Sequence, residues 1–346
     1  MELAIVIEKL VLIVLAFAIT MLIALYSTYA ERKVAGFLQD RYGPNRAGLF
    51  GLLQPLCDGA KLFAKEEFMP NIKNKVLFTV GPALSMIVSL LGVSVIPWGQ
   101  RFEIFGYSFV PQIADVNVAL LYVLAVMSTS VYGIIIGAWA SNNKYSLMGA
   151  IRAGAQMISY EIAMGLSIIA VVMMTGTLSL MEMTEQQSGW GGMRWNIFLQ
   201  PLSFLIFLVC SFAECNRTPF DLAECESELV NGHHVEFSSL KMGFYMFSEY
   251  ASMFFSSLLI SVLFFGGFNY PGIDWVTDNW GINISSLFGV LALLAKALFF
   301  IFFYMWIRWT IPRFRYDQLM RLGWKILFPL ALINILLVGF GIIIFN

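Results

Sequence analysis

LVLIVLAFAITMLIALYSTY, residues 10–29, is a run of twenty residues without a charged side chain. A helix of this length spans about 30 Å, which matches the hydrocarbon core of a bilayer. The run is longer than the apolar region of a typical secretory signal peptide, and it lacks a clear small-residue cleavage site. We therefore predict that it is a membrane-spanning helix and not a cleaved signal.

The composition of the whole chain indicates the same class of protein. Hydrophobic residues make up 59% of its 346 residues, charged residues make up 12%, and the mean hydropathy is +0.77. Seven further apolar stretches follow the first, at 76–98, 116–140, 162–180, 197–213, 243–268, 282–307 and 326–345. We predict an all-α polytopic membrane protein, a single membrane domain over 1–346 with eight transmembrane helices and no soluble domain.

Lysine and arginine are unevenly distributed between the predicted loops. The loops at 31–75, 141–155, 214–242 and 308–325 contain 17 of the 21 basic residues, whereas the alternate loops contain Arg101 and Arg194. Loops rich in these residues stay in the cytoplasm. We therefore predict that the four basic loops are cytoplasmic and that both termini face the periplasm, with the protein in the cell inner membrane.

The sequence lacks the common cofactor motifs. Its cysteines form no C-x-x-C pair, and its two histidines, His233 and His234, are adjacent. Zinc and iron–sulfur spacings, the dinucleotide-binding glycine motif and the P-loop are absent. We expect no metal, flavin or iron–sulfur cluster on this chain, and no nucleic-acid partner because no basic block exists. Nucleotide and metal centres would then belong to partner subunits.

The stretch AECNRTPFDLAECESE, residues 213–228, is the densest group of charges in the chain. Thr218 is predicted to be a helix N-cap, with Pro219 as the first helical residue and Asp221 completing a capping box. Five carboxylates belong to this stretch: Glu214, Asp221, Glu224, Glu226 and Glu228. Because like charges on one helix face repel, a solvated acidic loop and a functional cluster are both open at this point.

Ionisable residues also interrupt the apolar spans. Glu161 is expected at the start of the fourth span, and Glu214 at the end of the fifth, both on the cytoplasmic side. Glu249 and Lys296 lie inside spans, where such residues are costly and are usually functional. Lys296 is about 18 Å deeper than Arg308 on the same helix. Neighbouring carboxylates cannot all stay ionised, so we expect this group to pass protons or to respond to charge on a ligand.

The alternative for each of these residues is an ion pair that locks two helices together. Glu31 and Arg32, at the cytoplasmic end of the first span, are candidates for such a pair. In the loop that follows, Leu49 to Phe63 has the pattern of an amphipathic helix, with Asp58 and Lys61 on its polar face. This helix is predicted to lie in the membrane interface, or to line an opening at the level of the membrane.

Several ordered motifs resemble one family. They are ERKVAG at 31–36, RYGPNR at 41–46, GLLQPLCDGAK at 51–61, SYE at 159–161, the acidic stretch at 213–230, EY at 249–250 and RWTIPRFRYDQLM at 308–320. From about residue 10 to the C-terminus, the chain resembles the H subunit of bacterial proton-pumping NADH:quinone oxidoreductase, or complex I, the counterpart of mitochondrial subunit 1. The chain departs from the family at Cys215 and Cys225, where the family often has other small residues, and at His233, where it often has tyrosine. We expect the His233 imidazole to lie at the surface.

This resemblance implies a quinone chamber on the cytoplasmic side that is shared with peripheral iron–sulfur and quinone-site subunits. Quinone, either ubiquinone or menaquinone, would be the substrate, and neighbouring membrane subunits and lipid would be further partners. The implied coupling residues are Glu161, Glu214, Asp221, Glu224, Glu226, Glu228, Glu249 and Lys296. The implied chamber residues and their charge partners are Glu31, Arg32, Arg41, Asp58, Lys61, Arg217, Arg308 and Arg313.

The predicted function is therefore that of a membrane subunit that couples quinone reduction to proton translocation and is inactive alone. Two other classes stay open. A proton-coupled secondary transporter should show an inverted repeat with paired broken helices, and neither is evident. A membrane anchor of a hydrogenase-type complex would explain the basic loops, but it would not readily explain Glu249 and Lys296.

Overall fold

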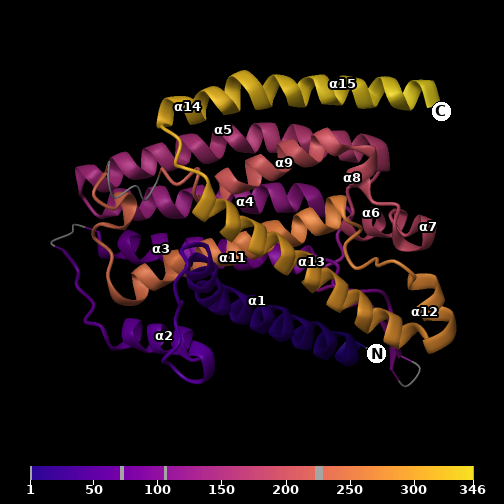
Figure 1. Ribbon diagram of the computed structural model, residues 1–346, viewed down its shortest axis with the longest axis horizontal. Coiled ribbons are helices and arrows are strands. Elements are labelled where there is room, and N and C mark those ends of the chain that lie inside the picture. Colours follow the sequence, from indigo (N-terminus) through magenta and orange to yellow (C-terminus); the bar gives the residue numbers. More distant parts are fainter. Residues whose placement is uncertain (1, 71–73, 105–106, 223–228, 346) are drawn as a thin grey trace.

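The computed structural model describes residues 2–70, 74–104, 107–222 and 229–345, and these form a bundle of long helices (Figure 1). In the described part of the chain, seven helical segments are long and apolar enough to cross a membrane. The helices that form all or most of each segment are α1 (Glu2–Leu38), α3 (Lys75–Leu91), α4 (Ala119–Ala140), α5 (Lys144–Thr175), α11 (Ser239–Phe264), α13 (Ile282–Thr310) and α15 (Phe328–Phe345). The prediction of an all-α polytopic membrane protein is confirmed.

The predicted span at 197–213 has a different form. It comprises α8 (Asn196–Leu199) and α9 (Pro201–Glu214), which are separated at Gln200. Pro201 lacks a backbone N–H and so begins a new helix there. Alone, the 14 residues of α9 extend about 21 Å, which is less than the thickness of the hydrocarbon core. The count of eight transmembrane helices therefore stays a prediction.

Helix α5 begins much earlier than the sequence pattern indicated. The expected loop at 141–155 is helical from Lys144 onward, because the Asn143 side chain caps the helix by accepting from the Tyr145 N–H. The first part of α5 contains polar residues, so a search for apolar runs does not include it in the predicted span. Glu161 therefore lies in the middle of a helix of 32 residues, and its predicted place at a helix start is wrong.

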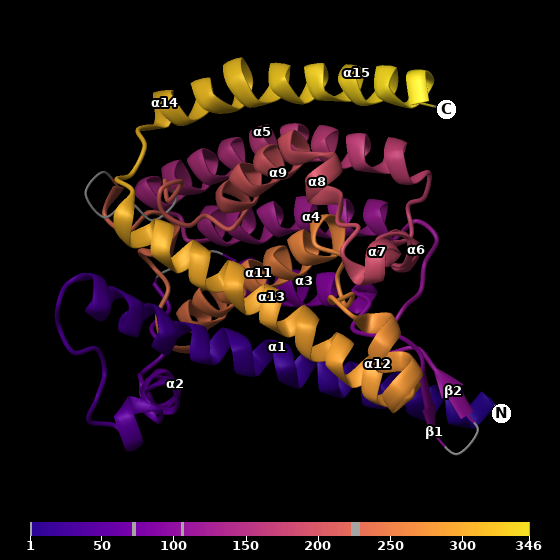
Figure 2. The same cartoon turned by 45° about the vertical axis from the view of Figure 1, so that its right-hand side comes forward.

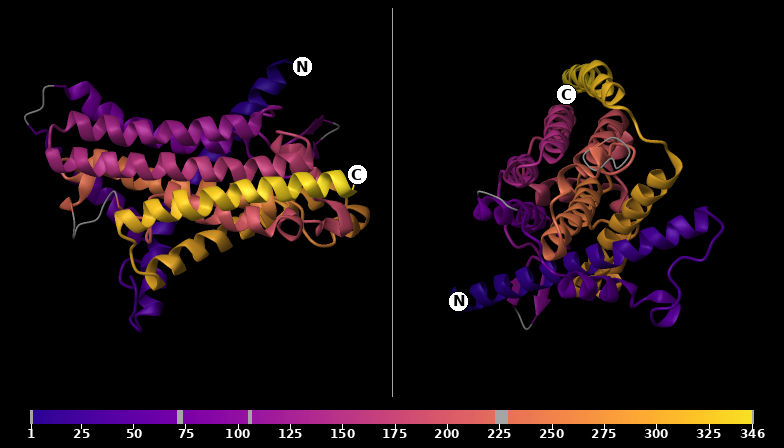
Figure 3. Two further views of the ribbon diagram at one scale, coloured as in Figure 1. Left: turned by 90° about the horizontal axis from the view of Figure 1, so that it is seen from above. Right: turned by 90° about the vertical axis from the view of Figure 1, so that its left-hand side faces the viewer.

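The helix α11 lies at the centre of the bundle. It packs against α1, α3 and α13, while α5 packs against α4, α9 and α15. Every residue of α11 from Met253 to Phe264 is buried. Figure 2 shows α15 on the outside of the bundle beside α5, and α1 on the opposite side. Seen from the end, α5 and α15 run roughly along the line of view, whereas α1 crosses the bundle at a steep angle (Figure 3).

Small residues allow α3 and α4 to approach each other closely. A Cβ atom on Gly81 would lie 2.5 Å from the Cα atom of Gly137, and one on Gly137 would lie 2.0 Å from the Tyr245 hydroxyl. Gly133 and Gly137 are four residues apart and so lie on the same face of α4. This is the spacing with which membrane helices pack at short distance, and it places α3, α4 and α11 around one polar region.

Short elements cover the two ends of the bundle. At the end that contains the N-terminus are the hairpin β1 (Phe102–Ile104) and β2 (Tyr107–Phe109), with α6 (Leu180–Gln186), α7 (Gly189–Gly192) and α12 (Ile273–Trp280). At the other end are the 3₁₀ turn η1 (Leu49–Gly51), α2 (Gln54–Ala64), the 3₁₀ turn η3 (Gly232–His234), α14 (Tyr316–Arg321) and the π-helical turn η4 (Leu322–Leu327). The 3₁₀ turn η2 (Gly92–Val95) extends α3. The predicted amphipathic helix is present as α2, although it begins at Gln54 and not at Leu49.

Candidate functional site

A buried carboxylate, Glu31 on α1, is the centre of a charged cluster. One of its oxygens accepts hydrogen bonds from Arg217 Nη1 at 2.9 Å and from the Tyr250 hydroxyl at 3.0 Å. Its other oxygen lies 2.5 Å from Nη1 of Arg308. The side chain is 8% exposed, so both oxygens are neutralised within the protein. We call Glu31, Arg217, Tyr250, Arg308 and Glu249 the hub.

Arg217 connects Glu31 to a second carboxylate on α11. Its Nη2 atom lies 3.8 Å from Glu249 Oε2, and its guanidinium stacks on the Tyr250 ring with Cζ 4.0 Å from the ring centroid. Burial opposes the charge of this group, but the Tyr250 oxygen and the two carboxylates outweigh burial, so the pKa of Arg217 lies above its ordinary value. Arg217 therefore stays cationic, and the predicted pair of Glu31 with Arg32 is replaced by pairs with Arg217 and Arg308.

The loop that carries Arg217 is held by a buried amide. Gln156 on α5 donates from Nε2 to the carbonyl oxygens of Ala213 at 2.9 Å and Phe220 at 2.7 Å, and it also contacts Asn216 Oδ1 at 3.3 Å. Gln156 is fully buried. Because one side chain binds both ends of the segment 213–220, it fixes where α9 stops and where Arg217 points.

The predicted helix N-cap at Thr218 is wrong. The segment from Arg217 to Phe220 is a turn, closed by the Phe220 N–H donating to the Arg217 carbonyl at 2.8 Å. Pro219 accepts a hydrogen bond from the Phe314 N–H at 3.1 Å. Asp221 pairs with Arg313 at 3.1 Å and completes no capping box. Tertiary contacts to the segment after α13 therefore override the local capping signal.

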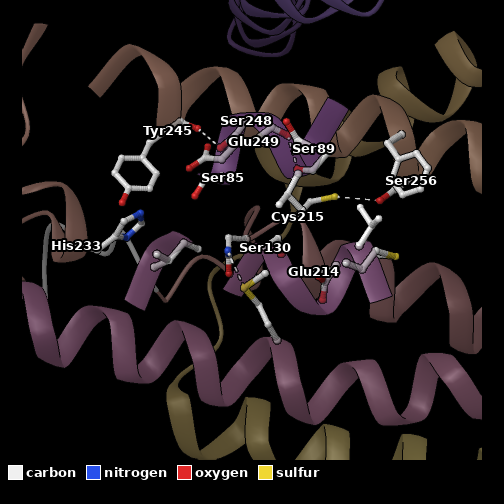
Figure 4. Close-up of a pocket in the computed structure, with 18 residues that line it drawn as sticks. Ser85, Ser89, Ser130, Glu214, Cys215, His233, Tyr245, Ser248, Glu249 and Ser256 are labelled. Carbon is white, nitrogen blue, oxygen red and sulfur yellow. Dashed lines mark hydrogen bonds between the residues drawn. The ribbon is translucent and has the colours of Figure 1, made fainter. Parts of the chain in front are cut away.

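A small cavity lies next to the hub, between α3, α4, α11 and the end of α9. Its volume is about 60 Å³, which is enough for a few water molecules. Glu249 and Glu214 lie on different walls of it (Figure 4). Six serine hydroxyl groups also line it, those of Ser85, Ser89, Ser130, Ser248, Ser252 and Ser256, together with the polar side chains of Tyr245, Asn216 and His233. Hydroxyls donate and accept, so these side chains can hold a chain of waters between the two carboxylates.

Glu214 ends α9, as predicted, and is buried beside the cavity at 7% exposure. Its Oε2 atom has no hydrogen-bond partner among the described residues, and Ser130 lines the same cavity. Glu161 on α5 is close enough to interact electrostatically with Glu214, and it accepts a hydrogen bond from the Ser128 hydroxyl. Ser128 and Ser130 of α4 thus lie beside two carboxylates, one from α5 and one from α9.

The charged and polar residues therefore form one path. It runs from Arg308 and Glu31 through Arg217 to Glu249, across the cavity to Glu214, and on to Glu161.

A family model described as NADH dehydrogenase matches residues 10–339. The chain is 66% identical over 339 residues to the H subunit of NADH-quinone oxidoreductase from Flavobacterium johnsoniae, covering 98% of this chain and 96% of the relative.

The chain belongs to the family of NADH-quinone oxidoreductase H subunits. It is also 64% identical to the H subunit of Flavobacterium psychrophilum, with both chains covered completely, and 45% identical to that of Helicobacter pylori, with 99% of each covered. The family resemblance inferred from the motifs is confirmed. The H subunit is a membrane subunit of an oxidoreductase complex, which agrees with the seven apolar helices in the described part of the chain.

Among the other residues implied by the family motifs, three lie together at α2. Arg32 Nη1 contacts Asp58 Oδ2 at 2.7 Å, and Lys61 lies 3.7 Å from the other oxygen of Asp58. This pairing joins α2 to α1. Arg41 lies apart from it, exposed, with its Nε donating to Gln39 at 2.7 Å. Glu224, Glu226 and Glu228 lie outside the described residues, as does Cys225.

His233 is not at the surface, contrary to our expectation. His233 and His234 are buried at 3% and 2% exposure, with ring centroids 3.8 Å apart, and both rings contact Tyr245. His233 also lines the cavity (Figure 4). Sequence reasoning missed Tyr245 and the six serines because isolated hydroxyls in apolar spans carry no periodic signal.

Lys296 lies away from the hub. Its ammonium group donates to the backbone carbonyls of Phe265 at 2.7 Å and Gly267 at 2.8 Å, and also to that of Asn269. These residues form the connection that follows α11. The coupling role of Lys296 stays a prediction. Its hydrogen bonds to these three carbonyls also stabilise the connection after α11. No group of three or more metal-ligating side chains is present among the described residues.

Proposed function

We propose that this chain forms part of the quinone chamber of an NADH-quinone oxidoreductase and couples quinone reduction to proton translocation. The observation that carries the proposal is the path from the hub through the cavity to Glu214 and Glu161. Its relatives are named as H subunits of NADH-quinone oxidoreductase, which supplies the reaction class. Electrons would reach quinone from a cluster in a peripheral partner subunit, because this sequence contains no cluster motif.

The hub would respond to a change of charge near its cytoplasmic face. Arg308 is partly exposed, with 28% of its side chain accessible, whereas Glu31 and Arg217 are almost fully buried. A charge that forms on quinone beside Arg308 would compete for its contact with Glu31. Charges interact strongly where water is excluded, so the Glu31 carboxylate would then draw Arg217 more closely.

Arg217 would transmit this change to the cavity. Its Nη1 atom binds Glu31, while its Nη2 atom is 3.8 Å from Glu249, which is beyond hydrogen-bonding distance. A shift of about 1 Å in the position of the guanidinium would therefore replace its hydrogen bond to Glu31 with one to Glu249. Such an exchange alters the charge that Glu249 presents to the cavity, and so biases where a proton resides between Glu249 and Glu214.

The outer elements would hold quinone and partners. On α2, Leu56 and Phe63 are exposed, as are Leu49 and Phe50 in η1, and this apolar surface fits an interfacial helix at the chamber entrance. The basic loops would face the cytoplasm and bind peripheral subunits, with both termini in the periplasm and the protein in the inner membrane.

The acidic stretch would support the coupling path. Asp221, through its pair with Arg313, would hold the loop that carries Arg217 in place. Glu224, Glu226 and Glu228 lie outside the described residues, and we propose for them the coupling roles that the family motifs imply.

The substitution Glu214→Gln tests this proposal in the assembled complex. It retains shape but removes a titratable group from the path, so NADH-driven quinone reduction should fall at least ten-fold while the complex assembles in normal amounts. The matched control is Glu185→Gln, an exposed acid on α6, which should leave the rate unchanged. A normal rate for a normally assembled Glu214→Gln complex would remove Glu214 from the mechanism. The chain expressed alone should not oxidise NADH.

The peripheral partners separate this proposal from a hydrogenase-type anchor. Purification of the native complex should recover subunits that oxidise NADH and reduce a soluble quinone. Recovery of a hydrogenase subunit in their place, with no NADH oxidation, would favour the anchor.

A further inference from the structure

Arg194 occupies an unusual position at the end of the bundle opposite the hub. It lies between α7 and α8 and is exposed. With Arg101, it is one of two basic residues in the predicted periplasmic loops. Arg101 donates to the Ser108 hydroxyl, but none of the ion pairs within the described residues includes Arg194, although the exposed acids Glu182 and Glu185 lie on α6 at the same end. Arg194 therefore presents a cation that no ion pair of the described residues neutralises.

The positions of the tryptophans indicate how deep Arg194 lies in the membrane. Five of the nine tryptophans lie at this end of the bundle: Trp98, Trp190, Trp195, Trp275 and Trp280. The other four lie at the hub end: Trp139, Trp306, Trp309 and Trp324. Trp280 ends α12 just before α13, and Trp306 lies near the other end of α13, so that the helix from Ile282 to Trp306 extends about 36 Å. Membrane proteins place tryptophan at both interfaces with water, so Arg194 lies at headgroup level.

The side chains around Arg194 are held by several contacts. The Trp195 ring stacks on Phe198 at a centroid distance of 6.2 Å, and its Nε1 donates to the Gly192 carbonyl at 3.0 Å. The Lys296 ammonium lies 5.1 Å from the Trp195 ring centroid. The stem of Arg194 packs on Gly189, where a Cβ atom would lie 3.0 Å from Arg194 Cδ. A ligand that binds here would therefore order few additional groups.

Two hollows meet at Arg194 and differ in polarity. The first has a volume of about 360 Å³ and is lined by Trp190, Trp195, Phe198 and Leu199 as well as Arg194. Trp190 is 80% exposed and Phe198 is 68% exposed. The second hollow has a volume of about 310 Å³, and its lining combines the polar residues Thr175, Gln186 and Asn196 with Met174 and Leu199. The first side of Arg194 thus suits a hydrocarbon chain, and the second offers more hydrogen-bonding groups to a polar headgroup.

From this geometry we infer that Arg194 and its two hollows form a binding site for an anionic phospholipid. The guanidinium binds the phosphate, an acyl chain lies over Trp190 and Phe198, and the headgroup enters the polar hollow. Arginine matches phosphate by its planar array of donors. A helix of a partner subunit would need an acid of its own to neutralise Arg194. A phospholipid contains both a negatively charged phosphate and an acyl chain in one molecule. This site is independent of quinone chemistry at the hub.

Photolabelling of the complete complex tests the site. The probe is phosphatidylglycerol with a diazirine in one acyl chain, added to detergent-purified complex that has been depleted of lipid. After irradiation, label should appear on the peptide containing Trp190–Leu199. In Arg194→Gln this label should fall about five-fold, as expected for removal of one cationic contact with an anionic lipid. The matched control, Arg101→Gln, removes the other basic residue of the predicted periplasmic loops and should keep the label.

Two further arms identify the ligand. Trp190→Ser removes part of the apolar hollow without touching Arg194, and it should halve the label. Inorganic phosphate at about ten times the lipid concentration should not compete, because it lacks the acyl chain. Equal labelling of wild type and Arg194→Gln would overturn the inference. So would competition by inorganic phosphate, or an unlabelled wild-type peptide, which would show that a partner subunit covers this surface.

Discussion

Arg217 binds Glu31 through one guanidinium nitrogen at 2.9 Å and faces Glu249 through the other at 3.8 Å. The two carboxylates come from α1 and α11, and the arginine comes from the loop after α9. One planar cation thus connects three segments that are distant in the sequence. Because Glu249 also lines the cavity, this contact is where, in the proposed function, a charge change beside Arg308 would reach the interior.

The substitution Arg217→Lys should impair the complex although it preserves charge. Lysine lacks the planar pair of donors and cannot stack on Tyr250 while also reaching toward both carboxylates. We expect NADH-driven quinone reduction to fall between ten- and a hundred-fold in a complex that still assembles. The measurement is the steady-state rate in membranes, normalised to the amount of complex.

Arg315→Lys provides the matched control for that measurement. Arg315 pairs with Asp317 at 3.3 Å, but both side chains are largely exposed, and exposed pairs contribute about 0–1 kcal/mol. Its rate should equal that of the wild type. If Arg217→Lys reduced quinone at the same rate as Arg315→Lys, a positive charge at position 217 would be sufficient for activity. The proposed exchange of Arg217 between Glu31 and Glu249 would then be rejected.

Glu249→Gln should affect proton translocation more than electron transfer. The amide keeps the hydrogen-bonding shape but cannot carry a proton into the cavity, so fewer protons should be translocated per quinone reduced. The measurement is acidification of proteoliposomes with a pH-sensitive dye, relative to the rate of NADH oxidation. Glu182→Gln, an exposed acid on α6, is the control. An unchanged ratio in Glu249→Gln would place Glu249 outside the proton path.

The sequence predicts the long helices well because apolar runs of about twenty residues have few alternatives to crossing a membrane. Its failures have physical causes. In α5, Lys144 and Gln156 are polar residues within a helix, so the pattern suggests a loop and misplaces Glu161. At Thr218, a local capping signal loses to the tertiary contact between Pro219 and Phe314.

The hub could be predicted as a set of residues but not as a geometry. Motifs drew attention to Glu31, Arg217, Glu249 and Arg308, yet Glu31 and Arg217 are 186 positions apart. No periodic pattern in a sequence indicates a contact between residues so far apart in the chain. The sequence therefore favours the adjacent Arg32 as the partner of Glu31. The cavity was not predictable, because its serines come from three helices and each one alone resembles a small residue at a helix contact.

Gln156→Leu should loosen the loop that carries Arg217. The substitution leaves the carbonyl oxygens of Ala213 and Phe220 without their donor, and each buried group left unpaired costs about 1–3 kcal/mol. We expect faster proteolysis between residues 215 and 222 and a lower rate of quinone reduction. Gln186→Leu, which removes an exposed amide that donates to Thr175, should change neither. Wild-type protease resistance in Gln156→Leu would show that other contacts hold the loop.

Lys296→Met separates the stabilising contact of Lys296 from its predicted coupling role. Three carbonyl oxygens after α11 would lose their donor, at about 1–3 kcal/mol for each that stays unpaired, so the melting temperature of the complex should fall. Lys9→Met is the control, because Lys9 donates to a single backbone carbonyl, that of Gln112, at 2.8 Å. If Lys296 only stabilises this connection, complexes that remain folded should translocate protons at the wild-type ratio. A lowered ratio at an unchanged melting temperature would instead assign Lys296 to coupling, since its carbonyl contacts would then be dispensable for stability.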